Sequence, residues 1–586
     1  MKLSKQQENI VNAPLESLSV IACAGSGKTK TAIHRLANMR AELRDERGYM
    51  ALLSFSNVAV KTFRDAYAKH LYEKGLNCSG SHARVVIETL DSFITSNILR
   101  PHASRTMGSK STPFLISGSE HFLNNEQYKF WAVKSDGESY PIQNNEVPNI
   151  SVKRKAGGLE FFIKKNDQIH IVNNGLSVLK KLGKVGAYTH TFGKLWAWKV
   201  LSEQKGLLNA LAKRYPHIII DEAQDLDPLH GVLIEKLISA GVKVSLIGDP
   251  NQAIYEFNGA NGDFLKDTNE KTDSHLCFPL SKNYRSIKDI LDISNTLSGN
   301  NDKYDRLKAH EGLGAYYVVF DPKHTPKTID MFTGEIERYG LDLANSVVLY
   351  RGRRQAEKIN GSITPIGQGK TKLLIEATVH RDIQRNYFEA YKKLATCVFG
   401  LIRETSENIE SLIVGNDLPQ ELQELRRKLW KFVRCPNSGL PSASLKAKSE
   451  WHPKAKTRVQ SLLAQIKDDY GYIPVKNLGH KLSAARLEDT TIDSTIDSTV
   501  DSQKVSKIRI DTVHQVKGES LSAVLYLATK REHIGDMLEG TNTEVGRIGY
   551  VALTRAKDLF MLGVPKSFSE EFTEKLSEKG FVEWKP

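Results

Sequence analysis

Short apolar runs recur along the chain, and most are followed by a stretch in which apolar residues have helical spacing. The runs that predict buried strands are residues 18–21, 51–55, 217–220, 244–247, 347–350 and 523–527. Alternation of short strands with helices predicts parallel α/β sheets. Acidic or polar residues follow several of these runs, at the strand ends where such sheets bind ligands. The expected fold class is therefore α/β with parallel sheets.

Two stretches interrupt this alternation and read as insertions into the α/β part. Residues of about 96–190 are polar, and residues 376–502 have mainly helical periodicity, for example at 418–432. Both insertions are expected to be largely helical. Residues 491–502 repeat one tetrapeptide three times (Thr-Ile-Asp-Ser, Thr-Ile-Asp-Ser, Thr-Val-Asp-Ser). Because this repeat has little apolar content, it predicts a flexible solvated linker, with a functional repeat as the alternative.

The segment directly after the first apolar run predicts a phosphate-binding turn. It lies between that run and a helical pattern at 31–36, so backbone N–H groups and a helix N-terminus would face a phosphate. Lys28 would reach the β- and γ-phosphates, and Thr29 would offer its hydroxyl to Mg²⁺. Ala22 stands where the P-loop pattern has its first glycine. The nucleotide-binding residues expected here are Ala22, Cys23, Ala24, Gly25, Ser26, Gly27, Lys28 and Thr29.

A second apolar run, at 217–220, ends in the acidic segment Asp-Glu-Ala-Gln-Asp at 221–225. Hydrolysis of ATP needs one carboxylate near Mg²⁺ and another that orients and deprotonates water. Asp221 suits the metal role, and Glu222 suits the water role. The alternative reading is an acidic helix N-terminus.

Composition narrows the class of protein. A chain of 586 residues is too long for one core, so several domains are expected. No apolar run approaches the roughly 18 residues that span a bilayer, and the N-terminus lacks a signal-peptide core, so a cytoplasmic protein without a membrane partner is expected. The five cysteines are scattered and form no CxxC pair, which favours reduced thiols. The net charge of +14 favours a polyanionic partner.

Eight further segments, in order along the chain, resemble the motifs of superfamily 1A DNA helicases of the UvrD, Rep and PcrA kind. Each match is short, but eight matches in the correct order are specific. They lie at residues 3–7, 54–59, 89–93, 248–255, 280–286, 348–351, 512–519 and 550–557.

The resemblance implies two RecA-like P-loop domains, each split by an insertion. The first domain would comprise 1–95 and 191–278, with 96–190 inserted. The second would comprise 279–375 and 503–586, with a reduced insertion at 376–502. It also implies Mg²⁺-dependent ATP hydrolysis coupled to 3′→5′ movement on single-stranded DNA and to unwinding of tailed duplex DNA.

Site residues follow from the same resemblance. Gln7 would read adenine, Tyr284 would stack on it, and Glu519 would contact the ribose, although it is displaced by one position from the family pattern. The catalytic set would be Lys28, Asp221, Glu222, Gln252, Arg285 and Arg555, of which the last three would read the γ-phosphate. The DNA contacts would be Ser54, Phe55, Asn57, Thr89, Tyr255, Phe257, Arg351, Thr512 and His514.

Some positions depart from the family pattern. Asp91 replaces a common histidine, and Asn258 replaces a common arginine. The second insertion is short, and only about thirty residues follow the last motif. In these respects the chain resembles UvrD-like subunits that pair with OLD-type nucleases in Gabija antiphage systems. The alternative function is therefore a DNA-sensing ATPase subunit that regulates a partner nuclease without processive unwinding. An RNA substrate also stays open.

Overall fold

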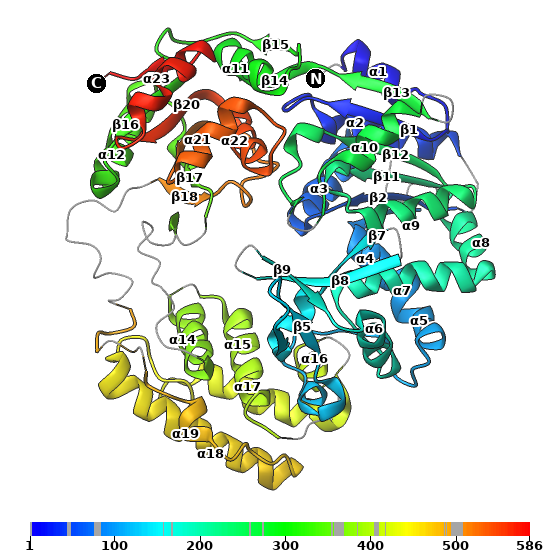
Figure 1. Cartoon of the computed structure of the whole chain (residues 1–586), viewed down its shortest axis with the longest axis vertical. Coiled ribbons are helices and arrows are strands. Elements are labelled where there is room, and N and C mark those ends of the chain that lie inside the picture. Colours follow the sequence, from blue (N-terminus) through cyan, green and yellow to red (C-terminus); the bar gives the residue numbers. More distant parts are fainter. Residues whose placement is uncertain are drawn as a thin grey trace. The chain divides into compact units, whose positions relative to one another are not determined.

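A computed structural model shows the chain as two compact units, which are described one at a time (Figure 1). The first unit comprises Met1–Pro113, Phe192–Ala356 and Ser506–Pro586, and the second comprises Phe114–Thr191 and Glu357–Val505. The residues that the structure describes are 3–43, 48–75, 84–155, 158–165, 168–256, 259–271, 275–352, 355–356, 369–383, 385–403, 409–415, 418–485, 487, 489–493 and 508–585.

The first unit contains two six-stranded sheets, and all strands in both are parallel to their neighbours. One sheet has the order β13-β1-β12-β11-β2-β3. Its strands are β1 (Leu18–Ala22), β2 (Met50–Ser54), β3 (Val85–Thr89), β11 (His217–Asp221), β12 (Lys243–Gly248) and β13 (Leu276–Leu280).

The other sheet has the order β18-β17-β19-β20-β16-β21. Its strands are β16 (Gly314–Phe320), β17 (Ser346–Tyr350), β18 (Arg509–Thr512), β19 (Leu521–Leu527), β20 (Ala556–Pro565) and β21 (Val582–Glu583). A separate parallel pair joins β14 (Lys282–Ile287) and β15 (Lys303–Arg306). The six predicted strands are all present, so the predicted α/β class with parallel sheets is confirmed.

Helices cover these sheets, as expected for parallel strands that are buried on both faces. Strands β2, β11 and β17 are buried along their whole length. The α-helices of this unit are α1 (Lys5–Val11), α2 (Lys28–Glu42), α3 (Asn57–Glu73), α4 (Leu90–Ile94), α5 (Arg100–Met107), α7 (His190–Glu203), α8 (Lys205–Arg214), α9 (Pro228–Ser239), α10 (Asp263–Glu270), α11 (Lys288–Ser298), α12 (Thr325–Arg338), α21 (Arg531–Glu539), α22 (Glu544–Arg555) and α23 (Ser569–Glu578).

The first insertion is built on a sheet, so the expectation that it is largely helical is wrong. Its five strands are antiparallel, in the order β6-β5-β9-β8-β7. Phe161 and Ile163 are buried while Phe162 and Lys164 are not, which is the period of a strand rather than of a helix. The elements are β5 (Trp131–Val133), β6 (Ser139–Pro141), β7 (Ser151–Lys155), β8 (Gly158–Lys165), β9 (Gln168–Val172) and α6 (Gly175–Lys184), and a short pair joins β4 (Phe114–Leu115) to β10 (Ala187–Tyr188).

The second insertion is helical, as predicted, and has a core of its own. Arg381 is fully buried and donates hydrogen bonds to the carbonyls of Val433, Leu440 and Pro441 at 2.9, 2.5 and 2.8 Å. Val433 lies in the last turn of α17 and the other two carbonyls follow that helix, so these bonds tie α14 to the end of α17 and to the segment after it. The helices are α14 (Gly369–Asp382), α15 (Tyr387–Phe399), α16 (Ile409–Val414), α17 (Gln423–Arg434), α18 (His452–Tyr470) and α19 (Leu478–Lys481).

The predicted linker at 491–502 is only partly within the described residues. Ile492 is fully buried in the core of the second insertion, and its N–H donates to the carbonyl of Leu445 at 3.3 Å. The start of the repeat therefore packs against the fold instead of forming a linker. Residues 494–502 lie outside the described residues.

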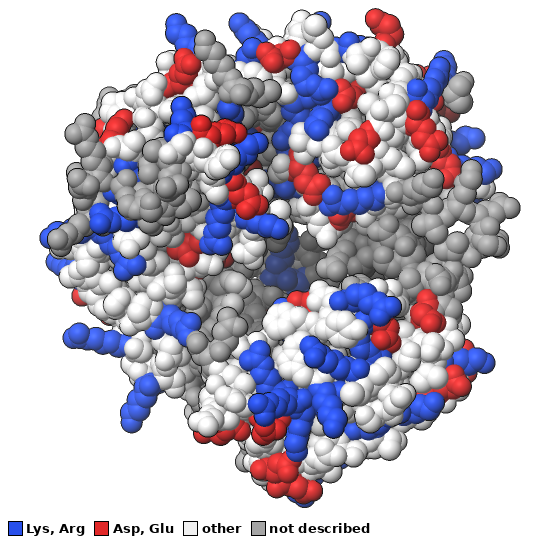
Figure 2. Space-filling model, turned by 180° about the vertical axis from the view of Figure 1, so that it is seen from behind, with Lys and Arg blue, Asp and Glu red and all other residues white. Residues whose placement is uncertain are grey.

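No helix among the described residues is both long and apolar enough to cross a bilayer. Lys and Arg side chains appear on both the upper and the lower part of the surface viewed in Figure 2, and Asp and Glu lie among them. Charge therefore does not mark one site on the face that Figure 2 shows.

Candidate active site

The turn between β1 and α2 approaches other parts of the chain closely. Gly25 and Gly27 have φ of 71° and 82°, which favours glycine. A Cβ on Gly25 would lie 2.5 Å from the Cβ of Arg285, and one on Gly27 would lie 2.7 Å from Nε2 of Gln7. Lys28 begins the 15-residue helix α2, and its Nζ donates to the carbonyl of Cys23 at 3.3 Å. This turn therefore has the form of a phosphate cradle at a helix N-terminus.

Two residues expected to bind adenine border this cradle. The Gln7 side chain accepts from the N–H of Ser4 at 3.0 Å and donates to the carbonyl of Ser26 at 3.1 Å. The N–H of Tyr284 donates to the carbonyl of Gly25 at 2.9 Å. Helix α1, the cradle and β14 are thus held together, and Gln7 and Tyr284 are brought to the same turn.

Asp221 ends β11, next to β12 in the sheet, and is 4% exposed. Its Oδ1 has no hydrogen-bond partner among the described residues. Burial, together with the nearby Glu222, raises the pKa of Asp221 to about 8. A buried, unpaired carboxylate oxygen suits a hard cation such as Mg²⁺, which binds few protein oxygens and keeps waters and phosphate oxygens as its other ligands. The Asp221 carboxylate therefore fits this ion, and the hydroxyl of Thr29 in the first turn of α2 stays the predicted second protein ligand.

Glu222 is held in an unusual backbone conformation. Its φ of 53° lies in the left-handed region, which is costly for a residue with a side chain. Gln224 Nε2 donates to its carboxylate at 2.6 Å. Burial alone would raise the pKa of Glu222, but Lys28 and Lys517 outweigh burial and lower it. The lowered pKa favours the ionised carboxylate, which is the form that a group needs to take a proton from water.

A continuous chain of hydrogen bonds leads from Glu222 to the second sheet. Gln224 Oε1 accepts from the N–H of Asp249 at 3.0 Å, and Asp249 Oδ2 accepts from Gln252 Nε2 at 2.7 Å. Gln252 Oε1 then accepts from Arg555 Nη2 at 2.7 Å. The carboxylate at one sheet and the guanidinium at the other are thus connected through Gln224, the backbone and side chain of Asp249, and Gln252.

Arg555 is buried beside this network, and Arg285 is half-buried there. Arg285 Nη1 donates to the carbonyl of Thr554 at 2.8 Å. Burial, with Arg555 adding to it, lowers the pKa of Arg285 to about 9, and burial likewise lowers the pKa of Arg555. Two guanidinium groups near each other and largely shielded from water are unfavourable without an anion, so this position favours binding of a negatively charged group.

Comparison with known proteins agrees with this geometry. Residues 3–273 match the UvrD/REP helicase N-terminal domain, and residues 371–566 match the UvrD-like helicase C-terminal domain. The chain belongs to the UvrD/Rep family of ATP-hydrolysing DNA helicases.

Several relatives of this helicase are distant in sequence. The putative ATP-dependent DNA helicase YjcD of Bacillus subtilis is 22% identical over 96% of this chain and 79% of that protein. The ATP-dependent DNA helicase Rep of Escherichia coli is 22% identical over 61% of this chain and 53% of that protein. The Gabija protein GajB of Bacillus cereus is 22% identical over 68% of this chain and 73% of that protein.

A buried ion pair joins the two sheets of the helicase. Lys517 Nζ donates to both carboxylate oxygens of Asp225, at 2.7 and 2.6 Å, and the two side chains are 7% and 3% exposed. The same ammonium lies 4.7 Å from the ring centroid of Tyr255. The His514 ring lies 5.7 Å from that of Tyr255, and its Nε2 is 3.1 Å from the carbonyl of Ile254. The sequence interpretation assigned Lys517 no role, although this lysine lies in a recognised motif.

The predicted DNA contacts fall into two groups at strand ends. Ser54, Phe55, Asn57 and Thr89 lie at the ends of β2 and β3, which are neighbours in the first sheet. Arg351, Thr512 and His514 lie at or after the ends of β17 and β18, which are neighbours in the second sheet. The ring of Tyr255, which follows β12 of the first sheet, packs against the ring of His514 in the second group. Phe257 and Asn258 lie outside the described residues.

Asp91 makes an intramolecular contact. Its carboxylate lies 3.6 Å from Nε2 of the buried His230, whose Nδ1 lies 3.2 Å from Asp227. Lys194 also pairs with Asp227. The Phe55 ring lies 6.0 Å from the His230 ring. Asp91 therefore takes part in the charge network beneath a predicted DNA contact.

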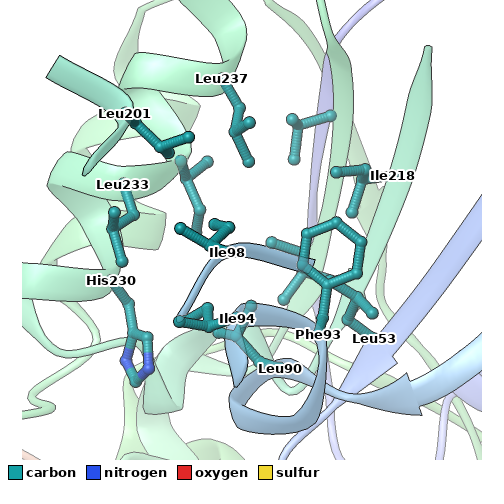
Figure 3. Close-up of a pocket in the computed structure, with 13 residues that line it drawn as sticks. Leu53, Leu90, Phe93, Ile94, Ile98, Leu201, Ile218, His230, Leu233 and Leu237 are labelled. Carbon is teal, nitrogen blue, oxygen red and sulfur yellow. The ribbon is translucent and has the colours of Figure 1, made fainter. Parts of the chain in front are cut away.

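The same histidine borders a small apolar cavity of about 20 Å³ (Figure 3). The other side chains drawn around it, such as Phe93, Ile98 and Leu233, are apolar. A cavity of this size holds at most one water and cannot hold a nucleotide. It is a packing feature between α4, α9 and the first sheet.

The carboxylate of Glu519 already has a hydrogen-bond partner within the chain. Arg509 donates to both of its carboxylate oxygens, at 2.8 and 3.1 Å. Arg555 Nη1 lies 3.4 Å from the carbonyl oxygen of Glu519. A ribose contact by Glu519 stays a prediction, and it would require the carboxylate to share or leave Arg509.

Proposed function

We propose that this helicase couples Mg²⁺-dependent ATP hydrolysis to 3′→5′ movement along single-stranded DNA and to unwinding of tailed duplex DNA. The observation that carries the proposal is the hydrogen-bond chain from Glu222 to Arg555. It connects the carboxylate at one sheet to the guanidinium at the other. A phosphate bound at Lys28 would therefore interact with groups from both sheets of the first unit. Two sheets coupled in this way would form a two-state element of the kind that nucleotide hydrolysis can bias.

The residues divide the work as follows. Lys28 and the N–H groups of its turn would hold the phosphates, while Thr29 and Asp221 would hold Mg²⁺. This ion, when bound, neutralises charge on the phosphates. Glu222 would orient and deprotonate the attacking water, and Gln252 would place it. Arg285 and Arg555 would stabilise the negative charge that develops during phosphoryl transfer.

The link to DNA would run through Tyr255. Its ring lies on the Lys517 ammonium, which is bonded to Asp225, three residues after Glu222. A base that stacks on Tyr255 would therefore press on an ion pair directly attached to the catalytic segment. This arrangement supports stimulation of ATP hydrolysis by single-stranded DNA.

The test is turnover of ATP with and without single-stranded DNA, followed by displacement assays on 3′- and 5′-tailed duplexes. Lys28→Ala is expected to abolish ATP hydrolysis and to leave binding of single-stranded DNA largely intact. Lys30→Ala, two residues further along α2, is the matched control and should keep turnover. Normal turnover in Lys28→Ala would refute the assignment of the cradle, and displacement of 5′-tailed duplexes alone would refute the polarity.

A second function is supported by the similarity to the Gabija protein GajB over 73% of its length. In that case the chain would sense DNA, hydrolyse ATP and regulate an OLD-type partner nuclease without processive unwinding. Stimulation of ATP hydrolysis by DNA without strand displacement by the isolated protein would favour this function.

A further inference from the structure

One face of the sheet in the first insertion is apolar and exposed. The antiparallel register pairs Phe162 with Ile171 and Ile171 with Val133, so these three side chains share a face. Alternation along the strands puts Trp131 and Ile169 on the same face. The exposed fractions of Trp131, Ile169 and Ile171 are 45%, 46% and 36%. We call this surface the sheet platform.

The stability of the sheet comes from its opposite face. Phe161, Ile163 and Val172 point to that side and are buried. Helix α6 packs there so closely that a Cβ on Gly175 would lie 2.1 Å from the Phe161 ring. The sheet platform is therefore not needed to hold the sheet together, and a contiguous exposed apolar face of this kind is typical of a binding surface.

Basic residues flank the aromatic rings of the sheet platform. Lys153 lies opposite Glu160 on the platform face, where its Nζ pairs with the Glu160 carboxylate at 3.0 Å and is 5.2 Å from the Phe162 ring centroid. Lys164 is exposed and lies opposite Ile169. Residues 151–165 carry five basic residues and one acidic residue. Positive charge beside the exposed Trp131 and the half-buried Phe162 complements a polyanion that also offers flat rings.

We propose that the sheet platform binds single-stranded DNA, with bases stacked on Trp131 and Phe162 and phosphates near Lys153 and Lys164. Proteins that grip single strands combine aromatic faces with a basic track in this way. The aliphatic Ile169 and Ile171 would pack against sugars. The inference rests on the proposed function and adds a contact outside the motor domains.

The test measures the affinity of the full-length protein for labelled oligodeoxythymidines of increasing length by fluorescence anisotropy. Trp131→Ala and Phe162→Ala are each expected to weaken binding of long oligomers by about 5- to 150-fold, the range for loss of one base stack. Leu159→Ala is the matched control, because Leu159 is 41% exposed but lies on the opposite face of β8. This control should bind like the wild type.

Lys164→Gln gives a second measurement that leaves the packed face untouched. Its affinity should depend less on salt, with the slope of log K against log salt reduced by about 0.7 for each phosphate that the variant no longer neutralises. Unchanged affinity at every length in the ring variants, with an unchanged salt slope, would overturn the inference. Loss of self-association in sedimentation with unchanged DNA affinity would also overturn it, because the platform would then join copies of the chain. Absence of DNA binding by the wild type would refute the proposed function itself.

Discussion

Removal of the Lys517 charge tests how the two sheets of the first unit communicate. The ammonium is bonded to both oxygens of Asp225, and both side chains are almost fully buried. Loss of one partner from such a pair costs about 3–5 kcal/mol, because the other charge is left buried and unpaired. In Lys517→Met, the arrangement that joins the sheets should therefore be disfavoured by about 10²- to 10⁴-fold.

The assay is steady-state ATP turnover, measured with and without saturating single-stranded DNA. Because the pair lies between Tyr255 and the catalytic segment, Lys517→Met should lose most of the stimulation by DNA. Lys530→Met is the matched control. Lys530 is exposed and follows β19 of the second sheet, so this variant should behave like the wild type.

A double variant separates the ion pair from general damage. Lys517→Met/Asp225→Asn removes both charges, and its loss of DNA-stimulated kcat/KM should be clearly smaller than the combined losses of the single variants. Additive losses, or full stimulation by DNA in Lys517→Met, would refute the reasoning that this pair carries the coupling.

Three further predictions concern stability and reactivity. Burial lowers the pKa of His217 to about 4, below the unfolded value of about 6.5, so the unfolded state binds the proton more readily. The free energy of unfolding should therefore fall by up to about 3 kcal/mol as the pH falls from 6.5 to 4. Urea titrations of His217→Gln should lack this component, and a pH slope identical to that of the wild type would contradict it. Leu233→Ala, at the apolar cavity, should lower the free energy of unfolding by about 2–5 kcal/mol, whereas the exposed neighbour Val232→Ala should change it by less than about 0.5 kcal/mol; equal effects in chemical denaturation would be inconsistent with the packing. Burial raises the pKa of the Cys23 thiol, so peptide mapping after maleimide treatment should find Cys435 modified well before it, and the reverse order would contradict the buried position.

Elements with strong local signals could be predicted from the sequence. The strand, glycine turn and helix around Lys28 form one continuous segment, and the acidic residues after β11 follow an uninterrupted apolar run. The helices of the second insertion also have clear periodicity, as in α17. In each case neighbouring residues carry the information, so no knowledge of distant contacts is needed.

The rest depends on contacts between distant segments. The strands β5 and β6 have three residues each, too few to show a period, and in β8 the apolar residues 161–163 are consecutive, so the buried alternation became visible only in the structure. Lys517 and Asp225 are 292 positions apart, and nothing near either residue indicates the other. The buried end of the repeat at Ile492 was missed for the same reason, because one isoleucine within a polar tetrapeptide does not reveal a core across the fold.

The backbone at Glu222 has a consequence for evolution and engineering. A glycine would adopt this φ without strain, so replacing the glutamate by glycine would relieve the backbone strain and remove the carboxylate. Selection for thermal stability alone would therefore favour glycine at this position, in a protein that is more stable but no longer hydrolyses ATP. A library screened for stability should therefore also be screened for ATP turnover. Without that second criterion, variants that lack the Glu222 carboxylate would be enriched.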